Sequence, residues 1–290
     1  MDVYEEVSLF YKKYRGEKRI YGQSAEGRNL YAFFVGKHEG ATGISQAAIH
    51  GREWITAYLS LYHIRRGVKK GGVWILPLTN PDGALLSQVG ITTAAVERRN
   101  FLVELNGGYD FSLWKANAEG VDLNVNFDAR WGTGARNVYS PASENFVGEY
   151  PFCAPETFAL KEFTEQICPD FTVSWHTKGE EIYWRFHQPV IRLLRDRRLA
   201  KKLSRNIGCP MREAKYSAGG YKDWCVEKLK IPAFTVEVGR DELSHPLGEE
   251  ILPELIKKYG DALCALTEGY HGRKIYARGD QARGKSQTKR

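Results

Sequence analysis

The chain holds residue types, at suitable spacing, for a hydrolytic zinc site. His50 and Glu53 are three positions apart, His176 follows far downstream, and Glu237 lies in a late apolar run. A catalytic zinc ion takes three protein ligands, keeps one position open for water, and works with a carboxylate that moves protons. Two histidines and one glutamate, together with a second glutamate, supply these parts.

Buried strands are expected to carry these side chains to one place. Residues 44–49 have the pattern of a buried strand that leads into the His-x-x-Glu pair, and 54–64 carries apolar residues at helical spacing. Two further apolar strands, 171–176 and 233–238, contain the second histidine and the late glutamate. Open sheets place their sites at the carboxyl ends of such strands, where loops converge. We therefore expect the four side chains to meet at one edge of a sheet.

Each of these features has a simpler explanation when it is taken alone. A His-x-x-Glu pair occurs by chance on many helices, and a single histidine at a strand end is more often a hydrogen-bonded core residue. Glu237 is harder to explain in this way, because a carboxylate between Val236 and Val238 is costly to bury without a partner. Three strand ends that carry ligand-type residues together favour a metal site.

The rest of the pattern indicates one α/β domain. Helices are expected at 2–14, from Pro155 on, and near 192–206, 221–230 and 248–270, and further strands near 19–23, 29–35 and 72–78. Residues 84–117 have no clean period, which suggests a functional insertion over the cleft, and 129–155 is expected to form a second extended loop.

Ordered motifs over roughly residues 20–270 resemble those of the carboxypeptidase A-type zinc metallopeptidases. The motifs are His50-Gly-Arg-Glu-Trp-Ile-Thr, Thr79-Asn-Pro-Asp-Gly83, Gly120-Val-Asp-Leu-Asn124, Ser143-Glu-Asn-Phe, Gly219-Gly220 with Asp223-Trp224, and Phe234-Thr-Val-Glu237-Val. The resemblance implies a single α/β domain with an eight-stranded mixed twisted sheet and helices on both faces. It also implies one Zn²⁺ ion on His50, Glu53 and His176, with Glu237 as general base and then general acid.

Departures from the family pattern narrow the expected substrate. Members that remove a C-terminal residue bind its carboxylate with an Asn-Arg pair, but here the pair reads Asn124-Val125. Lys115 stands where the family has an arginine that polarises the scissile carbonyl. The segments around Lys115 and after His176 are similar to the bacterial branch that cuts the γ-D-glutamyl to diaminopimelate bond of peptidoglycan stem peptides. The resemblance thus implies a peptide substrate such as a muropeptide or stem peptide.

Several residues are candidates for binding that substrate. Asn124 is carried over from the family motif. Arg130 or Arg136 is expected to replace the missing arginine, because a guanidinium binds a carboxylate with two parallel hydrogen bonds. Arg52 either lines the substrate side of the cleft or forms a structural salt bridge. Asp223 either receives a substrate ammonium group or caps the helix that starts there, with capping slightly favoured.

Composition limits the partners and the domain count. With 290 residues and 42% apolar residues, the chain can form one large catalytic domain, expected at 1–272, followed by a basic tail at 273–290. The net charge of +7 is concentrated in this tail and in the stretch 192–205. Neither segment interleaves basic residues with stacking aromatic ones, so solvated surfaces are favoured over nucleic-acid binding.

The location is expected to be the cytoplasm. The N-terminal segment lacks the pattern of a signal peptide or membrane anchor, and no apolar run is long enough to span a membrane. The five cysteines are scattered and lack Cys-x-x-Cys spacing, which favours reduced thiols; export without a recognisable signal stays possible. The oligomeric state is left open.

Two alternatives to a stem-peptide peptidase remain. One keeps the fold and the metal but changes the substrate, as in a carboxypeptidase for ordinary peptides or a related amidohydrolase. The other is a catalytically silent module that binds zinc or wall fragments, against which the presence of Glu237 argues.

Overall fold

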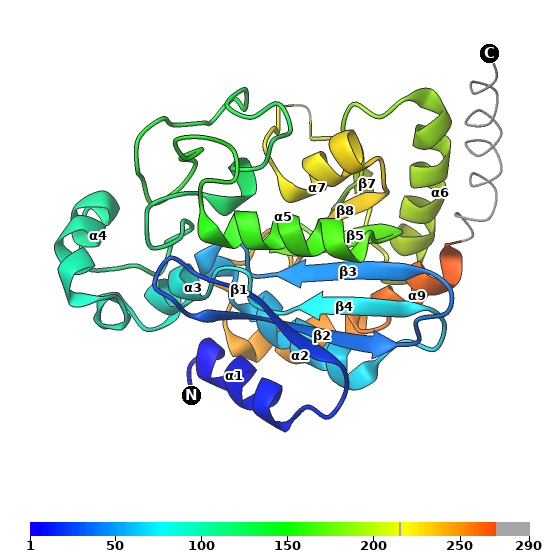
Figure 1. Ribbon diagram of the computed structural model, residues 1–290, viewed down its shortest axis with the longest axis horizontal. Coiled ribbons are helices and arrows are strands. Elements are labelled where there is room, and N and C mark those ends of the chain that lie inside the picture. The colour runs from blue at the N-terminus through cyan, green and yellow to red at the C-terminus, as the bar shows by residue number, and fades with distance from the viewer. Residues whose placement is uncertain (215, 271–290) are drawn as a thin grey trace, which may run out of the picture.

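An eight-stranded twisted sheet runs through the computed structural model, which describes residues 1–214 and 216–270 (Figure 1). The strands are β1 (Lys18–Gln23), β2 (Asn29–Gly36), β3 (Thr42–Ala47), β4 (Gly72–Leu76), β5 (Phe171–Thr177), β6 (Ile182–Tyr183), β7 (Met211–Arg212) and β8 (Ala233–Val238). Their order across the sheet is β1-β2-β4-β3-β5-β8-β6-β7. The expected domain end at 272 and the tail at 273–290 lie outside the described residues.

The centre of the sheet is parallel, and antiparallel pairing joins further strands to it on both sides. β4, β3, β5 and β8 run in the same direction, and their residues are almost all buried, because helices cover both faces of a parallel sheet. At one margin β2 pairs antiparallel with β1 and with β4; at the other β6 pairs antiparallel with β8. The predicted mixed sheet is confirmed.

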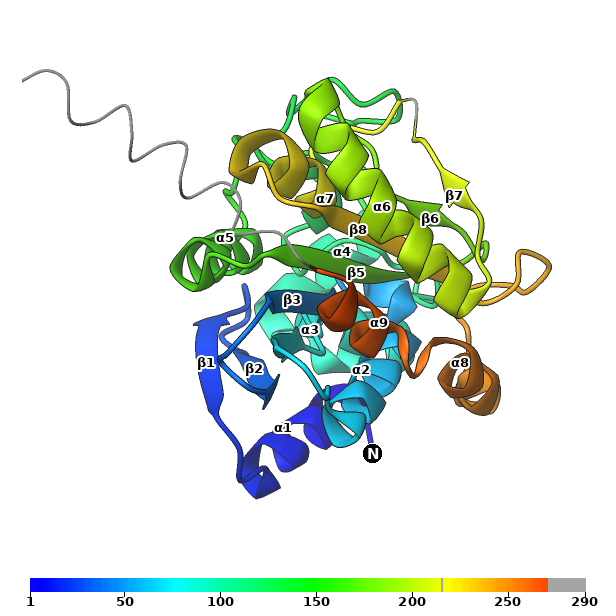
Figure 2. The same ribbon diagram turned by 90° about the vertical axis from the view of Figure 1, so that its right-hand side faces the viewer.

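Helices cover both faces of this sheet (Figure 2). The helices are α1 (Val3–Lys13), α2 (Ile55–Arg66), α3 (Pro81–Gln88), α4 (Arg99–Asn106), α5 (Pro155–Ile167), α6 (Val190–Ile207), α7 (Tyr221–Trp224), α8 (Leu252–Tyr259) and α9 (Ala262–Gly269). The apolar side chains of α1, α2, α6, α8 and α9 form one core cluster with the sheet, and those of α5 and α7 form a second. Of the helices in the described residues, none is both long and apolar enough to cross a membrane.

Three local expectations needed correction. Residues 84–117 are not an irregular insertion, because α3 and α4 lie there; α3 starts at Pro81, where the side chain of Asn80 accepts a hydrogen bond from the Gly83 amide. The helix expected at 248–270 is divided into α8 and α9 by a break at Gly260 and Asp261. β6 and β7 were not anticipated, since two residues are too few to show an alternating pattern.

Candidate metal centre and its surroundings

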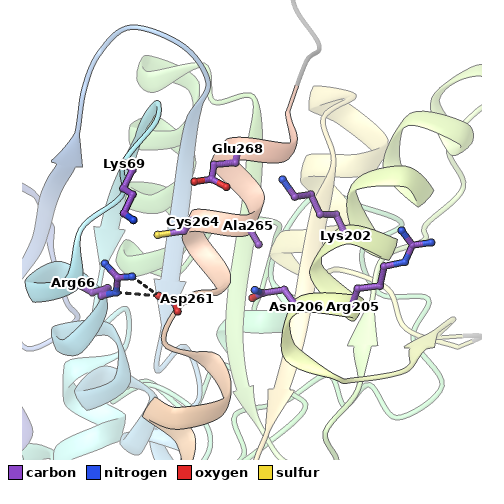
Figure 3. A pocket seen from close by; sticks show the side chains of 9 residues that line it. All are labelled: Arg66, Lys69, Lys202, Arg205, Asn206, Asp261, Cys264, Ala265 and Glu268. Carbon is purple, nitrogen blue, oxygen red and sulfur yellow. Dashed lines mark hydrogen bonds and ion pairs between the residues drawn. The ribbon is translucent and has the colours of Figure 1, made fainter.

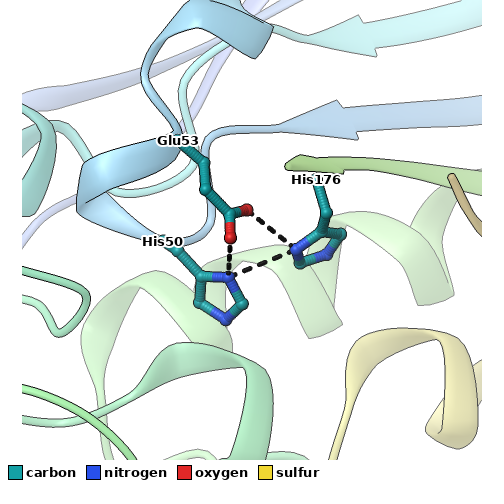
Figure 4. A group of neighbouring side chains, drawn as sticks. All are labelled: His50, Glu53 and His176. Atoms are coloured by element: carbon teal, nitrogen blue, oxygen red, sulfur yellow. Dashed lines mark hydrogen bonds and ion pairs between the residues drawn. The ribbon is translucent and has the colours of Figure 1, made fainter. Parts of the chain in front are cut away.

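The carboxyl ends of β3 and β5 bring His50, Glu53 and His176 together (Figure 4). His50 follows β3, a 3₁₀ turn over Gly51–Glu53 carries the glutamate back toward it, and His176 lies on β5, the adjacent parallel strand. All three side chains are buried, and one ligand atom from each lies within 4.8 Å of the others. The predicted convergence of these three residues is confirmed.

The donor atoms of this cluster fit a metal ion better than they fit hydrogen bonds alone. Oε1 of Glu53 lies 2.9 Å from Nδ1 of His50, its Oε2 lies 2.9 Å from Nδ1 of His176, and the two Nδ1 atoms are 3.2 Å apart. Each Nδ1 has either one proton or one lone pair, so it cannot satisfy both of its neighbours. A single cation between them can, and imidazole nitrogen with carboxylate oxygen is a ligand set that zinc takes.

Glu53 is held in the ionised form that a metal ligand needs. Burial alone would raise the pKa of its carboxyl, but the two imidazoles outweigh burial and hold that pKa well below its usual range.

Glu237 stands beside the cluster on the next strand. β8 runs parallel to β5, and their register places Glu237 opposite His176. Burial raises the pKa of the Glu237 carboxyl to about 7, against the opposing charge of His176. A carboxyl with a pKa near neutrality can accept a proton and return it within one reaction.

A buried aspartate joins the metal cluster to Lys115. Oδ1 of Asp122 lies 3.4 Å from Nε2 of His50, and its Oδ2 lies 2.8 Å from Nζ of Lys115. Asp122 is fully buried, and burial alone would raise its pKa; Lys115 and His50 outweigh this and keep the carboxyl ionised. A carboxylate on the outer nitrogen of a histidine ligand fixes the ring and its tautomer.

Backbone contacts hold Lys115 at this place. Its carbonyl accepts a 3.0 Å hydrogen bond from the Gly51 amide, and the carbonyl of Ala116 accepts one of 3.0 Å from the side chain of Asn80. Gly51 must be glycine, because a Cβ there would lie 2.4 Å from the Gly83 carbonyl oxygen. The Thr79-Asn-Pro-Asp-Gly83 motif thus packs against the backbone at Gly51 and Ala116 and helps to position Lys115 beside the metal cluster.

Arg52 lies between His50 and Glu53 in the chain, and Asn124 lies two residues after Asp122. Asn124 is half-buried, and its Oδ1 accepts a 3.2 Å hydrogen bond from the amide of Tyr221 at the start of α7. Nη1 of Arg52 lies 3.6 Å from Oε2 of Glu144, which is the salt bridge that the sequence left as one of two readings. Arg52 is also close enough to His245 to lower the pKa of that imidazole, although burial is the larger cause.

Arg130 and Arg136 lie on the loop that follows Asn124 but do not meet the cluster. Nε of Arg130 is 3.3 Å from Oε1 of Glu227, so its guanidinium already has a carboxylate partner. Arg136 is exposed. Within the described residues, no contact joins either arginine to the metal cluster, and their expected binding of a substrate carboxylate stays a prediction.

The helix-capping role expected for Asp223 is wrong. α7 has no side-chain cap at its start, and Asp223 is fully buried with its oxygens bound by Lys222 and by the Ser217 hydroxyl. Because its carboxylate is enclosed and already paired with a cation, a direct contact between Asp223 and a substrate ammonium group has no support in the geometry.

Two residues that the sequence analysis did not single out lie at the site. Asp122 could have been found, because it is a carboxylate between the apolar Val121 and Leu123, the same signal that marked Glu237. His245, whose Nδ1 lies 3.3 Å from the Thr177 hydroxyl beside the third cluster residue, had no such signal, since it follows β8 in an irregular segment.

A separate hollow of about 420 Å³ lies at the far end of α2 from the metal cluster (Figure 3). It is lined by Arg66, Lys69, Lys202, Arg205, Asn206, Asp261, Cys264, Ala265 and Glu268. α2 begins beside Glu53 and ends at Arg66, so about 18 Å of helix separates the two places. Arg66 pairs with Asp261 at 2.9 Å. The mixture of positive and negative side chains agrees with the solvated surface expected for the stretch 192–205.

Relatives of known structure share this fold. Thrombin activatable fibrinolysis inhibitor superposes with a TM-score of 0.73 at 20% identity, covering 92% of this chain and 76% of that one. The murein-tripeptide amidase MpaA from Escherichia coli O157 superposes with a TM-score of 0.59 at 24% identity, covering 90% and 94%.

Sequence comparison adds a relative and a family. The chain is 30% identical to gamma-D-glutamyl-L-diamino acid endopeptidase 1 of Lysinibacillus sphaericus over 223 residues, 70% of this chain but only 56% of that protein, so it spans little more than half of the relative's length. Residues 12–259 match the model of the family described as zinc carboxypeptidase. Because that match runs through the strands that carry the metal cluster and Glu237, the chain belongs to the zinc carboxypeptidase family, Peptidase M14.

Proposed function

We propose that this chain is a zinc peptidase that hydrolyses the γ-D-glutamyl to diaminopimelate amide bond of peptidoglycan stem peptides. The observation that carries the hydrolytic part is the meeting of a three-residue metal cluster with Glu237 and Lys115 at one sheet edge. The choice of bond rests on the named activity of the relative from Lysinibacillus sphaericus.

In this proposal His50, Glu53 and His176 would hold one zinc ion with two imidazole nitrogens and a carboxylate as ligands. Zinc supplies a Lewis acid and makes water a nucleophile near neutral pH. Glu237 takes the proton from the attacking water and gives it to the leaving amine. Its raised pKa suits both steps, because a stronger acid would not accept the proton and a weaker one would not return it.

Lys115 stabilises the negative charge that develops on the carbonyl oxygen. Its pKa is raised, because the attraction of Asp122 exceeds the effect of burial, so its ammonium group stays charged. Asp122 acts through its neighbours: one oxygen orients His50 and the other holds Lys115. A single carboxylate therefore sets the position of one metal ligand and one oxyanion donor.

We propose that Asn124 and Arg52 contact the substrate at the wall of the cleft, since Arg52 lies between His50 and Glu53 in the chain and Asn124 lies two residues after Asp122. We propose a cytoplasmic location from the sequence pattern of the cysteines, which are scattered and lack Cys-x-x-Cys spacing.

A carboxypeptidase for ordinary peptides is the second candidate, because the family description names that activity. It is disfavoured by Val125, which offers no cation to a terminal carboxylate next to Asn124. A silent binding module is disfavoured because it gives no use to Glu237, a carboxyl with a raised pKa beside the metal cluster, whereas hydrolysis uses it as the base.

The proposal is tested by incubating a defined L-alanyl-γ-D-glutamyl-diaminopimelate peptide with zinc-loaded protein and measuring the masses of the products by mass spectrometry. The expected result is one pair of fragments from the γ-D-glutamyl bond, and none from the Glu237→Gln variant at equal zinc content. Release of a C-terminal residue from a blocked dipeptide, with the stem peptide intact, favours the carboxypeptidase. Full zinc loading without any cleavage favours the silent module.

A further inference from the structure

A buried glutamate outside the metal cluster holds the segment that carries Lys115. Glu156, in the first turn of α5, is fully buried. Its Oε2 accepts a 3.0 Å hydrogen bond from Nδ2 of Asn117, and its Oε1 accepts one of 3.0 Å from the amide of Ala25. The side chain thus ties the turn of the β1–β2 hairpin to the segment just after Lys115.

Asn117 in turn organises the chain between Lys115 and Asp122. Its side-chain Oδ1 accepts hydrogen bonds of 3.0 Å from the backbone amides of Glu119 and Val121. Its backbone amide donates a hydrogen bond of 2.9 Å to the Val121 carbonyl. These bonds close a tight turn over 117–121. Because Lys115 precedes this turn and Asp122 follows it, the turn sets how the ammonium group meets the carboxylate.

A glutamate at position 156 is energetically unfavourable because its carboxyl group is buried. Its presence therefore indicates that a carboxyl group is needed there. Burial, together with the smaller effect of the Asp82 charge, raises the pKa of the Glu156 carboxyl to about 8. A glutamine would avoid that cost but has only one acceptor oxygen. With Oδ1 of Asn117 committed to two backbone amides, the Asn117 side chain cannot turn to suit a glutamine, so only a carboxyl satisfies both Asn117 and Ala25.

We propose that Glu156 is a positioning residue that, through Asn117 and the turn 117–121, holds Lys115 against Asp122. For catalysis this inference rests on the proposed function, in which Lys115 stabilises the oxyanion. Its structural content is independent of the substrate, because the Lys115–Asp122 contact can be measured without any turnover.

The test measures how fast the Lys115 amine is acylated by a succinimidyl ester in the full chain, followed residue by residue by mass spectrometry. In the native protein Lys115 has a side chain that is only 15% exposed and is paired with Asp122, so its acylation is slow. Glu156→Gln is expected to speed acylation at Lys115 by about tenfold, the effect of one lost hydrogen bond on the local equilibrium, while the exposed Lys12 keeps its rate.

Glu26→Gln is the matched control. Glu26 belongs to the same group of buried carboxylates, but its Oε1 accepts from the Ala95 amide at 2.9 Å and its Oε2 pairs with Arg28, so it does not touch Asn117. It is expected to lower the melting temperature without changing the acylation of Lys115. Equal acceleration in both variants would mean general loosening and would overturn the proposal.

Asn117→Ala provides a second route if Glu156→Gln folds poorly. It should speed Lys115 acylation at least as much, because it also removes the two bonds that Asn117 Oδ1 accepts, and adding Glu156→Gln to it should change the rate little, because the link to Glu156 is already lost. An unchanged rate in folded Glu156→Gln or Asn117→Ala overturns the proposal whatever the substrate is. When turnover of the substrate is measured instead, Glu156→Gln should lower kcat about tenfold in the native protein but should not lower it further in the Lys115→Ala variant. If Glu156→Gln lowers kcat by the same factor in both proteins, the proposal is also overturned.

Discussion

Replacing Asp122 by asparagine tests the link between the metal cluster and Lys115. The two oxygens of Asp122 face four donors: His50 Nε2, Lys115 Nζ and the amides of Asn124 and Asn145. Asparagine keeps the shape but has one oxygen and no charge, so its amide group must face at least one donor. The change therefore leaves Lys115 without a counter-charge and His50 without its orienting carboxylate.

The expected size of this effect follows from burial. Removing one partner of a buried ion pair costs about 3–5 kcal/mol, and we take the lower end because water reaches part of Lys115. For a domain of this length the unfolding entropy is about 0.6 kcal/mol per degree, so about 3 kcal/mol corresponds to a fall of about 5 °C in melting temperature. The loss of an orienting carboxylate lowers metal affinity about 10–100-fold.

Two measurements on Asp122→Asn check these figures. Competition with a chromogenic chelator gives the zinc dissociation constant, and calorimetry gives the melting temperature of the metal-free protein. Asp128→Asn is the control, since Asp128 forms a largely exposed pair with Lys228 at 3.2 Å and should change both quantities very little. Zinc affinity and stability equal to those of the native protein would refute the bridging role of Asp122.

Further predictions concern other residues of the metal site, the metal itself and one buried histidine, His63. Lys115→Ala should lower turnover by about 10²–10³-fold, the usual effect of one oxyanion donor, while zinc content stays at one ion per chain by atomic absorption. Glu237→Gln should keep that zinc content and lose turnover, and an active variant would remove Glu237 as the base. Chelation of the metal should lower the melting temperature, and added zinc should restore it, because a ligand of the folded state stabilises that state; a melting curve that ignores zinc would contradict the metal cluster. Burial lowers the pKa of His63 to about 4, so the unfolded chain binds a proton that the folded chain refuses, and stability should fall by about 3 kcal/mol as the pH drops from about 6.5 to about 4. Between pH 7 and pH 5, urea unfolding should show about 2 kcal/mol of this loss in the native protein but not in His63→Gln, which can still donate to the Tyr259 carbonyl, and parallel losses in both proteins would exclude His63 as the cause.

The strands of the site could be predicted from the sequence because each one is a continuous apolar run with a polar residue at its end. His176 and Glu237 follow directly from such runs, and their neighbouring strands pair in register. The His50–Glu53 pair was equally visible, since both residues lie within one turn. The cluster therefore needed only local pattern and the general rule that parallel strands end at one edge.

Contacts between distant segments could not be predicted in this way. Asp223 was expected at a helix cap or a substrate ammonium group, but packing places it against Lys222 and Ser217. Arg130 or Arg136 was expected to bind substrate, and the sequence did not indicate that Arg130 pairs with Glu227. In each case several partners were compatible with the sequence, and the packing of the surrounding loops selected one.

The residue types at positions 50, 53, 176 and 237 thus determined the class of chemistry, because few arrangements of imidazole and carboxylate serve another purpose at buried strand ends. Only the tertiary structure decided that Asp122 bridges His50 and Lys115 and that Glu156 holds Asn117. The physical reason is that a hydrogen bond depends on the positions of atoms to within a fraction of an ångström, and such positions arise only when the whole core is packed.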